Sequence, residues 1–418
     1  MAKNLLTRKA EFDVIIMTNS PGELSALARP TIEKLHAELP RARIILILTP
    51  CQYASGREID YANTIPGISR IITPKEYKKW LFLNKKPIGI RFNPKGIVIF
   101  LGGDLFHSIF IAKRLRFKAM AYVLDRIGWK RSFTKFLVPD ERTYKKFKRL
   151  GLTDKKLNII GDLMVDSINT YPKKEDIIER NNLKPNKKIV TFLPGSRPLQ
   201  TKNLLPFYVD IIDLLNSKTK EAQYVLSVSP FTAIDDLANY VKGKGKLVTE
   251  SGLSYIISNA GNRVLVSKAL NYEVISISDL CVTVPGTNTA QVAALGKPML
   301  VVFPFNKPEV LPVEGLLGLI TSIPILGVQL KRMLVKIVNE NTDFFALPNI
   351  KAEKEIVPEI RGVLTPSEVA ESILSLLRNQ RKLDQMSAAL TAIMGEKGAA
   401  ANLLAEVKLL IREEVSTK

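Results

Sequence analysis

Short apolar runs alternate with longer amphipathic stretches along the chain, beginning at Phe12. Apolar runs that are bounded by polar or glycine-rich turns are typical of strands buried on both faces of a sheet. The predicted strands are residues 13–17, 44–48, 97–101, 119–124, 136–138, 157–160, 189–193, 224–228, 263–266, 280–284 and 299–302. Helical periodicity between them is clearest at residues 24–39, 141–150 and 202–215. This alternation predicts parallel sheets with crossover helices.

The pattern weakens between residues 161 and 187, where the charged stretches KKED and KPNKK separate two series of strands. A chain of 418 residues is long for one hydrophobic core, so two domains are expected. We predict an α/β protein with two Rossmann-like domains, residues 1–170 and 185–365, whose parallel sheets face a cleft. Residues 366–418 are predicted as successive helices, for which packing on the first domain is one open arrangement. Ligands are expected at the carboxyl ends of the strands.

Two glycine-containing turns in the second half each follow a predicted strand and begin a helical stretch. The first is PGSR, from Pro194 to Arg197, and the second is PGTNTAQ, from Pro285 to Gln291. An arginine guanidinium is a planar, permanently charged donor for phosphate oxygens. The first N–H groups of a helix also bind anions, and the helix dipole adds to that attraction. We predict a diphosphate site formed by Ser196, Arg197, Gly286, Thr287, Asn288, Thr289 and Gln291.

Carboxylates follow two predicted strands in the first half. Asp104 comes after a strand and two glycines, where a general base would project into the cleft. The same position suits the N-cap of the next helix, and the local sequence favours that role. His107 lies on the first turn of this helix and is a candidate to face the same cleft. Gly22 and Glu23, in the turn TNSPGEL, are candidates for close ligand approach and for binding a sugar hydroxyl.

The sequence offers little for metal or redox chemistry. No DxD pair follows a predicted strand, and neither histidine belongs to a metal-ligand spacing. Cys51 and Cys281 lie in or just after apolar runs, which predicts buried, reduced thiols in a cytosolic protein. The N-terminus is too polar for a secretory signal, and no uncharged run is long enough to span a bilayer. We expect no metal, no resident cofactor, and a protein that is soluble or peripheral to a membrane.

The formal net charge of +21 is concentrated in one quarter of the chain: between Lys75 and Arg149, 20 Lys or Arg residues stand against five Asp or Glu residues. The segment from Lys75 to Lys95 mixes lysines with aromatic residues, which suits an anionic lipid surface, stacking on nucleic-acid bases, or a solvated basic loop. A second segment, from Leu316 to Leu330, carries no charge and suits a buried helical hairpin or a contact with the bilayer surface. Together they favour a membrane surface and make nucleic acid a weak option. A homo-oligomer stays open.

The chain resembles the lipid-A-disaccharide synthase family, particularly its divergent synthase-related branch. The similarity covers most of the chain. The segments that carry it are NSPGEL, FLGGDLF, LPGSR, PGTNTAQVAALGKPM and ALPNIKAEKEIVPEI. The last is the most specific, because its LPN and EIVPE elements serve no generic nucleotide-binding purpose.

The resemblance implies a GT-B fold and the inverting, metal-independent transfer of an acylated glucosamine from a UDP-linked donor to a monosaccharide lipid, at the cytoplasmic face of the membrane. Asp104 matches the family's proposed base, and Arg197 matches the arginine that contacts the donor diphosphate. The residues that match the nucleotide-binding turn are Gly286, Thr287 and Thr289. Asn349 and Glu355 fall in the matching late motif, as candidates for substrate binding.

Gln291 departs from the family pattern, which usually has a glutamate there to bind ribose hydroxyls; glutamine keeps an acceptor oxygen but lacks the charge. The NSPGEL turn and the length of the uncharged segment from Leu316 to Leu330 also differ. Two alternatives therefore remain. One is a nucleotide-sugar 2-epimerase with the same architecture, and the other is a catalytically decayed protein that binds lipid or sugar.

Overall fold

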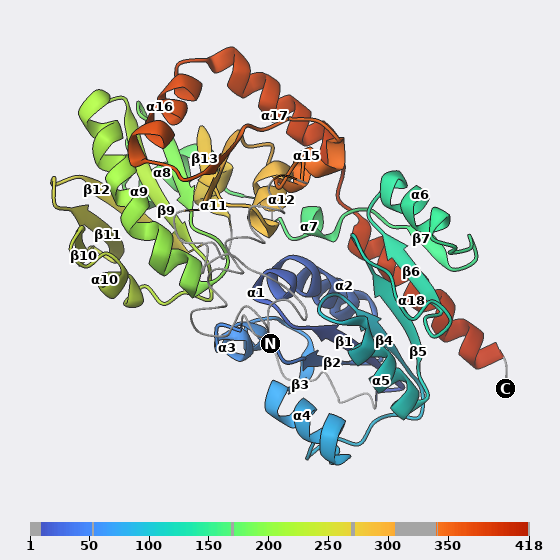
Figure 1. The fold of residues 1–418 in the computed structure, drawn as a ribbon. Helices are drawn as coiled ribbons and strands as arrows, with labels where there is room; N and C mark the ends of the chain where they lie inside the picture. The colour runs from blue at the N-terminus through green and yellow to red at the C-terminus, as the bar shows by residue number, and fades with distance from the viewer. Residues whose placement is uncertain are drawn as a thin grey trace. The chain divides into compact units, whose positions relative to one another are not determined.

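A computed structural model describes residues 10–51, 54–168, 171–268, 272–305, 340 and 342–416. The chain forms two compact units (Figure 1). The first unit comprises Met1–Ser167 together with Gly395–Lys418, and the second comprises Ile168–Met394. The predicted segment from Leu316 to Leu330 lies outside the described residues.

The first unit is built on a seven-stranded parallel sheet, counted over the described residues, in the order β3-β2-β1-β4-β5-β6-β7. The strands are β1 (Phe12–Thr18), β2 (Ala42–Leu48), β3 (Ile68–Ile72), β4 (Gly96–Phe100), β5 (Lys118–Tyr122), β6 (Lys135–Val138) and β7 (Leu157–Ile159). All of them except β3 were predicted. The central strands are buried on both faces because helices cover the sheet, which explains their continuous apolar runs.

Crossover helices connect these strands. They are α1 (Pro21–Glu23), a π-helical turn (Leu24–Ala28), α2 (Arg29–Glu38), α3 (Glu58–Asn63), α4 (Pro74–Leu83), α5 (Leu105–Leu115) and α6 (Glu141–Arg149), and α7 (Leu163–Asp166) follows the last strand. Asp13 is the buried charge of β1, and its carboxylate accepts from the Arg43 guanidinium at 2.9 and 2.8 Å. Asn93 donates to it through its backbone N–H at 2.8 Å and its amide at 2.7 Å. This cluster ties the loop before β4 to the sheet.

The second unit has an eight-stranded sheet over its described residues, in the order β10-β11-β12-β9-β8-β13-β14-β15. The strands are β8 (Lys188–Leu193), β9 (Ala222–Val228), β10 (Gly245–Glu250), β11 (Leu253–Ser258), β12 (Arg263–Lys268), β13 (Leu280–Thr283), β14 (Met299–Pro304) and β15 (Glu359–Gly362). Its helices are α8 (Lys174–Arg180), α9 (Pro198–Lys218), α10 (Asp236–Tyr240), α11 (Glu273–Ser276), α12 (Thr287–Ala294), α15 (Leu347–Ala352), α16 (Pro366–Leu377) and α17 (Gln380–Met394).

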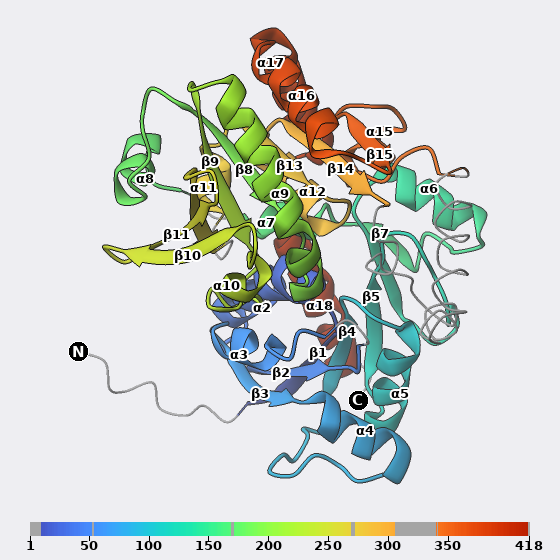
Figure 2. The same ribbon diagram turned by 60° about the vertical axis from the view of Figure 1, so that its left-hand side comes forward.

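The sequence had led us to expect a wholly parallel sheet, and this expectation is wrong for the second unit. β10 and β11 form an antiparallel hairpin at its edge, and β11 also runs antiparallel to β12 (Figure 2). The sequence pattern missed this hairpin and β15. The outer strand β10 has no buried residue, so it lacks the apolar run by which the buried strands were recognised.

The C-terminal helices divide between the two units. Helices α16 and α17 belong to the second unit, whereas α18 (Ala399–Ser416) belongs to the first, beside its sheet (Figure 1). The Asp166 carboxylate holds the start of α18 by accepting from Gly398 N at 2.7 Å and Ala400 N at 2.6 Å. Lys118 Nζ donates to Leu410 O at 3.3 Å farther along the helix. The chain therefore returns to complete the unit in which it began.

Candidate active site

The first candidate site is the carboxyl edge of the first unit's sheet, between β1 and β4. β2 pairs with one side of β1 and β4 with the other, so the strand order reverses between β1 and β4. Ligands of open α/β sheets bind at such a switch point. The turn after β1 contains Gly22 and Glu23, and the turn after β4 leads to Asp104. The sheet order thus places predicted site residues from distant parts of the chain at one edge.

The two turns pack closely against each other. A Cβ atom at Gly102 would lie 2.3 Å from Glu23 Cδ, so only glycine leaves room for that carboxylate. Gly103 has φ +94°, and a Cβ atom there would lie 3.0 Å from the Asn19 side chain. Ser20 Oγ donates to Glu23 Oε2 at 2.9 Å, and Glu23 N donates back to Ser20 Oγ at 3.3 Å. Close packing therefore requires both glycines.

Asp104 is the N-cap of α5, as the local sequence favoured. Its Oδ1 accepts from Phe106 N at 2.8 Å. The residue is nevertheless exposed, and Oδ2 has no hydrogen-bond partner within the part of the chain that the structure describes. Capping uses one oxygen and leaves the other facing solvent. The two roles considered for Asp104 are thus compatible.

His107 lies near Asp104 and contacts Tyr77 of α4. The Tyr77 hydroxyl lies 2.8 Å from His107 Nδ1, and the two rings meet edge to face at 5.2 Å between centroids. Burial raises the pKa of Tyr77, and the Asp104 charge raises it further, so the hydroxyl keeps its proton at neutral pH. Burial lowers the pKa of His107 below 6.5, although Asp104 opposes this shift. His107 is therefore mainly neutral at pH 7.

The second candidate site is the corresponding edge of the second unit's sheet. β9 pairs with one side of β8 and β13 with the other, so the strand order reverses between β8 and β13. Leu193 at the end of β8 pairs with Thr283 at the end of β13. The PGSR turn follows β8, and the PGTNTAQ turn follows β13. Parallel pairing therefore places the two predicted diphosphate-binding turns side by side.

The PGSR turn is fixed against the first turn of α9. Gly195 has φ +106°, and a Cβ atom there would lie 2.3 Å from Gln200 Oε1. The same oxygen accepts from Arg197 N at 3.3 Å. Pro194 and Gly195 are buried, while Ser196 and Arg197 are half-buried. The accessible residues of this turn are therefore the two that were predicted to contact phosphate.

The PGTNTAQ turn opens α12. Gly286 has φ +130°, and the space around its Cβ position is empty to 4 Å, so the backbone itself is open to close approach. Gly286 is the N-cap of α12, and no side-chain hydrogen bond caps this helix in the described structure. Thr287 and Asn288 are half-buried on its first turn. This helix start has the features of an anion site.

Thr289 and Gln291 lie behind the turn. Thr289 is fully buried, and its hydroxyl donates to Gly286 O at 2.8 Å and accepts from Leu347 N at 3.1 Å. Gln291 is 3% exposed, and its amide donates to the Tyr272 hydroxyl. Both had been predicted to contact the nucleotide. In this structure their side chains hold the turn from inside the protein.

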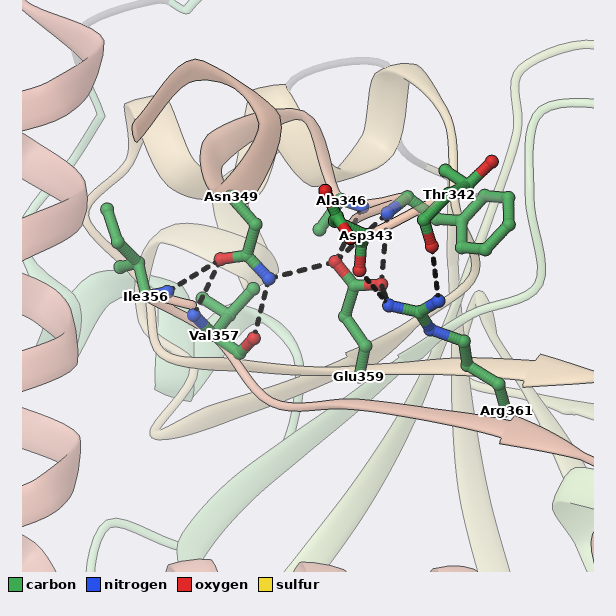
Figure 3. Close-up of polar contacts among 9 residues, drawn as sticks. Thr342, Asp343, Ala346, Asn349, Ile356, Val357, Glu359 and Arg361 are labelled. Carbon is green, nitrogen blue, oxygen red and sulfur yellow. Dashed lines mark hydrogen bonds and ion pairs between the residues drawn. The ribbon is translucent and has the colours of Figure 1, made fainter. Parts of the chain in front are cut away.

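A buried carboxylate that we had not selected from the sequence organises the loop before β15 (Figure 3). The Glu359 side chain is 4% exposed. Its carboxylate accepts from Phe345 N at 3.1 and 3.0 Å and from Ala346 N at 2.9 Å. Arg361 Nη2 lies 3.3 Å from Glu359 Oε2. The only signal in the sequence was the specificity of the EIVPE element, which contains Glu359.

Asn349 completes the same network (Figure 3). Its Oδ1 accepts from Ile356 N at 2.7 Å and Val357 N at 2.9 Å. Its Nδ2 donates to Val357 O and to Glu359 Oε1, both at 2.8 Å. The amide is therefore fully used within the loop, which makes Asn349 a framework residue here. Glu355, the other substrate-binding candidate of this motif, is exposed.

The segment from Lys75 to Lys95 divides into a buried and an exposed part. Tyr77 and Trp80 are fully buried in the core of the first unit. Phe82, Leu83 and Ile88 are 75%, 62% and 89% exposed. We call these three residues, with the exposed Lys78, Lys79, Lys85 and Lys86, the basic tip. Although Tyr77 and Trp80 belong to the core, the exposed part of the segment still mixes apolar and basic residues.

Within the described residues, no group of three or more His, Cys, Asp or Glu side chains is arranged to hold a metal ion. No helix among the same residues is long and apolar enough to cross a membrane. Cys281 is fully buried in β13, and burial raises the pKa of its thiol to about 12. Cys51 is half-buried.

Comparison with known proteins identifies relatives of the chain. The family model described as lipid-A-disaccharide synthetase matches residues 133–311, which include Arg197 and the whole PGTNTAQ turn. The lipid-A-disaccharide synthase of Nitrosococcus oceani is 26% identical over 259 residues. The chain is a relative of the lipid-A-disaccharide synthases.

The match to these synthases is partial. It covers 62% of this chain and 57% of the N. oceani protein. The synthase of Persephonella marina is 27% identical over 261 residues, which are 61% of this chain and 60% of that protein. The segment matched by the family model contains the second-unit turns but not Asp104 or Glu359.

Solved structures agree on the fold of this synthase relative. A putative UDP-N-acetylglucosamine 2-epimerase from Listeria monocytogenes covers 96% of each chain with a TM-score of 0.59 at 12% identity. A UDP-glucosyltransferase from Polygonum tinctorium aligns with a TM-score of 0.51 at 12% identity, and the alignment covers 97% of this chain and 100% of the transferase chain. Together with the two α/β units and the C-terminal helices, these similarities identify the fold as GT-B.

Proposed function

We propose that this chain is a glycosyltransferase that moves a glucosamine-type sugar, acylated as in lipid A disaccharide synthesis, from a UDP donor to a lipid-linked sugar acceptor. One observation carries the proposal: each sheet has candidate site residues at its switch point, with a carboxylate in one unit and, in the other, two glycine turns suited to an anion. The relation to the lipid-A-disaccharide synthases supports the reaction class and the acceptor.

The second unit would bind the donor. Solved structures of this fold include a UDP-N-acetylglucosamine 2-epimerase from Neisseria meningitidis bound to UDP-GlcNAc, with a TM-score of 0.55 at 12% identity. In this chain, the N–H groups at the start of α12 and the Arg197 side chain would receive the diphosphate. The arginine charge and the N–H dipoles of the helix start would stabilise UDP as it leaves, without a metal ion.

The first unit would bind the acceptor. Its hydroxyl oxygen would attack the anomeric carbon of the donor sugar while the bond from that carbon to the diphosphate oxygen breaks. UDP would leave with the bonding electron pair, and Asp104 Oδ2 would take the hydroxyl proton. A single displacement of this kind inverts the anomeric centre. The neutral His107 beside Asp104 would add a polar group to the site without adding charge.

The basic tip would bring the site to an anionic membrane surface, at the cytoplasmic face. Its exposed apolar side chains can enter the interface while its lysines remain among the lipid headgroups. Each lysine near such a surface contributes about 1 kcal/mol. Replacing Lys78, Lys79, Lys85 and Lys86 by Glu should therefore abolish sedimentation with anionic vesicles. Unchanged sedimentation would contradict this assignment.

The decisive experiment compares two N-cap aspartates. Asp104→Asn keeps a capping oxygen but removes the base, so turnover should fall about 10²- to 10⁴-fold while UDP binding is unchanged. Asp140 caps α6 by accepting from Thr143 N at 2.8 Å, and Asp140→Asn is the matched control that should keep full turnover. Full turnover in Asp104→Asn would reject the proposed mechanism. Absence of a thermal shift with any UDP-sugar would contradict the donor assignment.

A nucleotide-sugar 2-epimerase is the second candidate, because the L. monocytogenes and N. meningitidis proteins with similar folds are described as such. Incubating the chain with UDP-N-acetylglucosamine alone separates the two. An epimerase would convert the donor without any acceptor, whereas a transferase would release UDP only when a lipid acceptor is added. Binding of an acylated UDP-glucosamine donor with neither outcome would indicate a catalytically decayed relative.

A further inference from the structure

Two exposed aromatic rings lie beside Asp104. Phe106 is 38% exposed, Trp129 is 49% exposed, and their ring centroids are 5.9 Å apart. The backbone N–H of Phe106 is the group that Asp104 caps, so one ring is tied directly to the candidate base. Single exposed apolar residues are ordinary, but paired aromatic faces next to a candidate catalytic group indicate a binding surface.

Sheet topology accounts for the pairing of these rings. Phe106 follows β4, and Trp129 lies in the connection between β5 and β6. The connection after β5 crosses beside the first turn of α5, where the contact between the two rings places Trp129 next to Phe106. A Cβ atom at Gly128 would come within 3.5 Å of Leu105 Cδ1, which confirms that the two connections are in contact.

The loop that carries Trp129 is fixed by lysines from the elements that follow it. Lys156 Nζ donates to Lys130 O at 2.9 Å and to Phe133 O at 2.8 Å. Lys146 Nζ donates to Asp125 O at 2.8 Å. Trp129 itself has φ +53°, a conformation that bulky residues rarely adopt. The backbone of the loop that carries the indole is thus held in place before any ligand arrives, which lowers the entropy lost on binding.

The apolar surface continues along α5. Phe110 is half-buried and lies next to Phe106, with ring centroids 6.1 Å apart, while the Arg114 guanidinium lies over the Phe110 ring at 4.7 Å. Phe106 thus contacts an aromatic ring on each of two elements, and neighbouring apolar groups of this kind suit a hydrocarbon chain better than a single sugar ring. Exposed Arg131 lies two residues after Trp129 and complements an anionic headgroup, whereas the exposed Arg126 is paired with Asp125 at 3.4 Å.

We propose that Phe106, Phe110 and Trp129 form a subsite for an acyl chain of the lipid acceptor, with Asp104 next to the sugar that carries the chain. This inference rests on the proposed function, because it takes Asp104 to mark the acceptor side. The subsite selects acylated over unacylated acceptors by removing hydrocarbon from water. Phe110 also contacts Tyr77 of α4, with ring centroids 6.4 Å apart, so the subsite adjoins the helix that carries part of the basic tip.

Trp129 provides its own probe. The chain has two tryptophans, and Trp80 is fully buried, so quenching by acrylamide reports on Trp129. Monomeric N-decanoyl-glucosamine should protect Trp129 from acrylamide and shift its emission to shorter wavelength. N-acetylglucosamine, which has the same sugar without the long chain, should do neither. Phe106→Ala should weaken the decanoyl response about tenfold, and Leu409→Ala, at a 53% exposed position on α18, should leave it unchanged.

Three results would overturn the subsite. They are no response to N-decanoyl-glucosamine, an equal response to N-acetylglucosamine, and an equal response to bare anionic vesicles, which would make the rings a membrane anchor. In turnover assays, Phe106→Ala should raise the KM for an acylated acceptor about tenfold and leave the KM for the UDP donor unchanged. The fluorescence experiment needs no turnover, so the two proposals can fail independently. A failed fluorescence response with a working transferase would reject the subsite alone, and a positive response without transferase activity would reject the proposed function alone.

Discussion

Glu359 offers the sharpest test of how the second unit holds its candidate donor site. Glu359→Gln keeps an acceptor at the Oε1 position, which receives Phe345 N, Ala346 N and Asn349 Nδ2. It places an amide NH₂ at the Oε2 position, which faces Phe345 N and the Arg361 guanidinium. Loss of one charge-assisted contact and creation of a donor–donor clash should destabilise the loop by about 2 kcal/mol.

A larger truncation should have a larger effect. Glu359→Ala leaves the same three N–H donors without their carboxylate, at a position where the Glu359 side chain is only 4% exposed. We therefore expect a loss of about 3–5 kcal/mol in the free energy of unfolding. Glu355→Gln changes an exposed glutamate of the same motif and should stay within about 0.5 kcal/mol of the parent chain. The loss of stability should thus be largest for Glu359→Ala, smaller for Glu359→Gln and smallest for Glu355→Gln.

Hydrogen–deuterium exchange measures this effect locally, at the amides of Phe345 and Ala346. A 2 kcal/mol loss corresponds to roughly 30-fold faster exchange there. The change should also weaken UDP binding, because Leu347 N bonds to Thr289, whose hydroxyl bonds to Gly286 O in the predicted diphosphate turn. Unaltered exchange in Glu359→Gln, or an equal effect of Glu355→Gln, would refute the role given to this carboxylate.

Three further predictions follow from other parts of the structure. Gly286→Ala should weaken UDP binding about tenfold in calorimetry, since φ +130° is strained for alanine. Gly261, in the hairpin between β11 and β12, also has a positive φ and open space around it, so Gly261→Ala is the control that should leave UDP binding unchanged. The NMR titration of His107 should have its midpoint below 6.5 and move lower still in Asp104→Asn, because the carboxylate raises this pKa; an upward move would contradict the electrostatic reading. Asp13→Ala should destabilise the first unit by about 3–5 kcal/mol in urea unfolding, since the change leaves the Arg43 guanidinium without its buried carboxylate. A loss below about 1 kcal/mol would show that water takes the place of that carboxylate.

The sequence located most buried strands and the turns after them, because residues packed on both faces of a sheet must be apolar in succession. It missed β3, β10, β11 and β15, and of these β3, β10 and β15 have one buried residue or none. It also named Thr289, Gln291 and Asn349 as ligand contacts; that prediction stands untested, and in the structure their side chains bond to Gly286, Tyr272 and Val357. A motif shows that a polar residue is needed, but it does not show whether that residue contacts a ligand or the protein.

The sequence by itself determined the α/β class, the two series of strands, and the glycine turns that can approach a phosphate, since these depend on local periodicity and backbone freedom. Tertiary structure decided which turns become neighbours, because strand order is set by long-range pairing. It placed Glu23 against Gly102 and PGSR beside PGTNTAQ. It also brought Phe106 and Trp129 together beside Asp104, and it returned α18 to the first unit. Contacts between residues far apart in the chain depend on packing of the whole sheet, which no local pattern specifies.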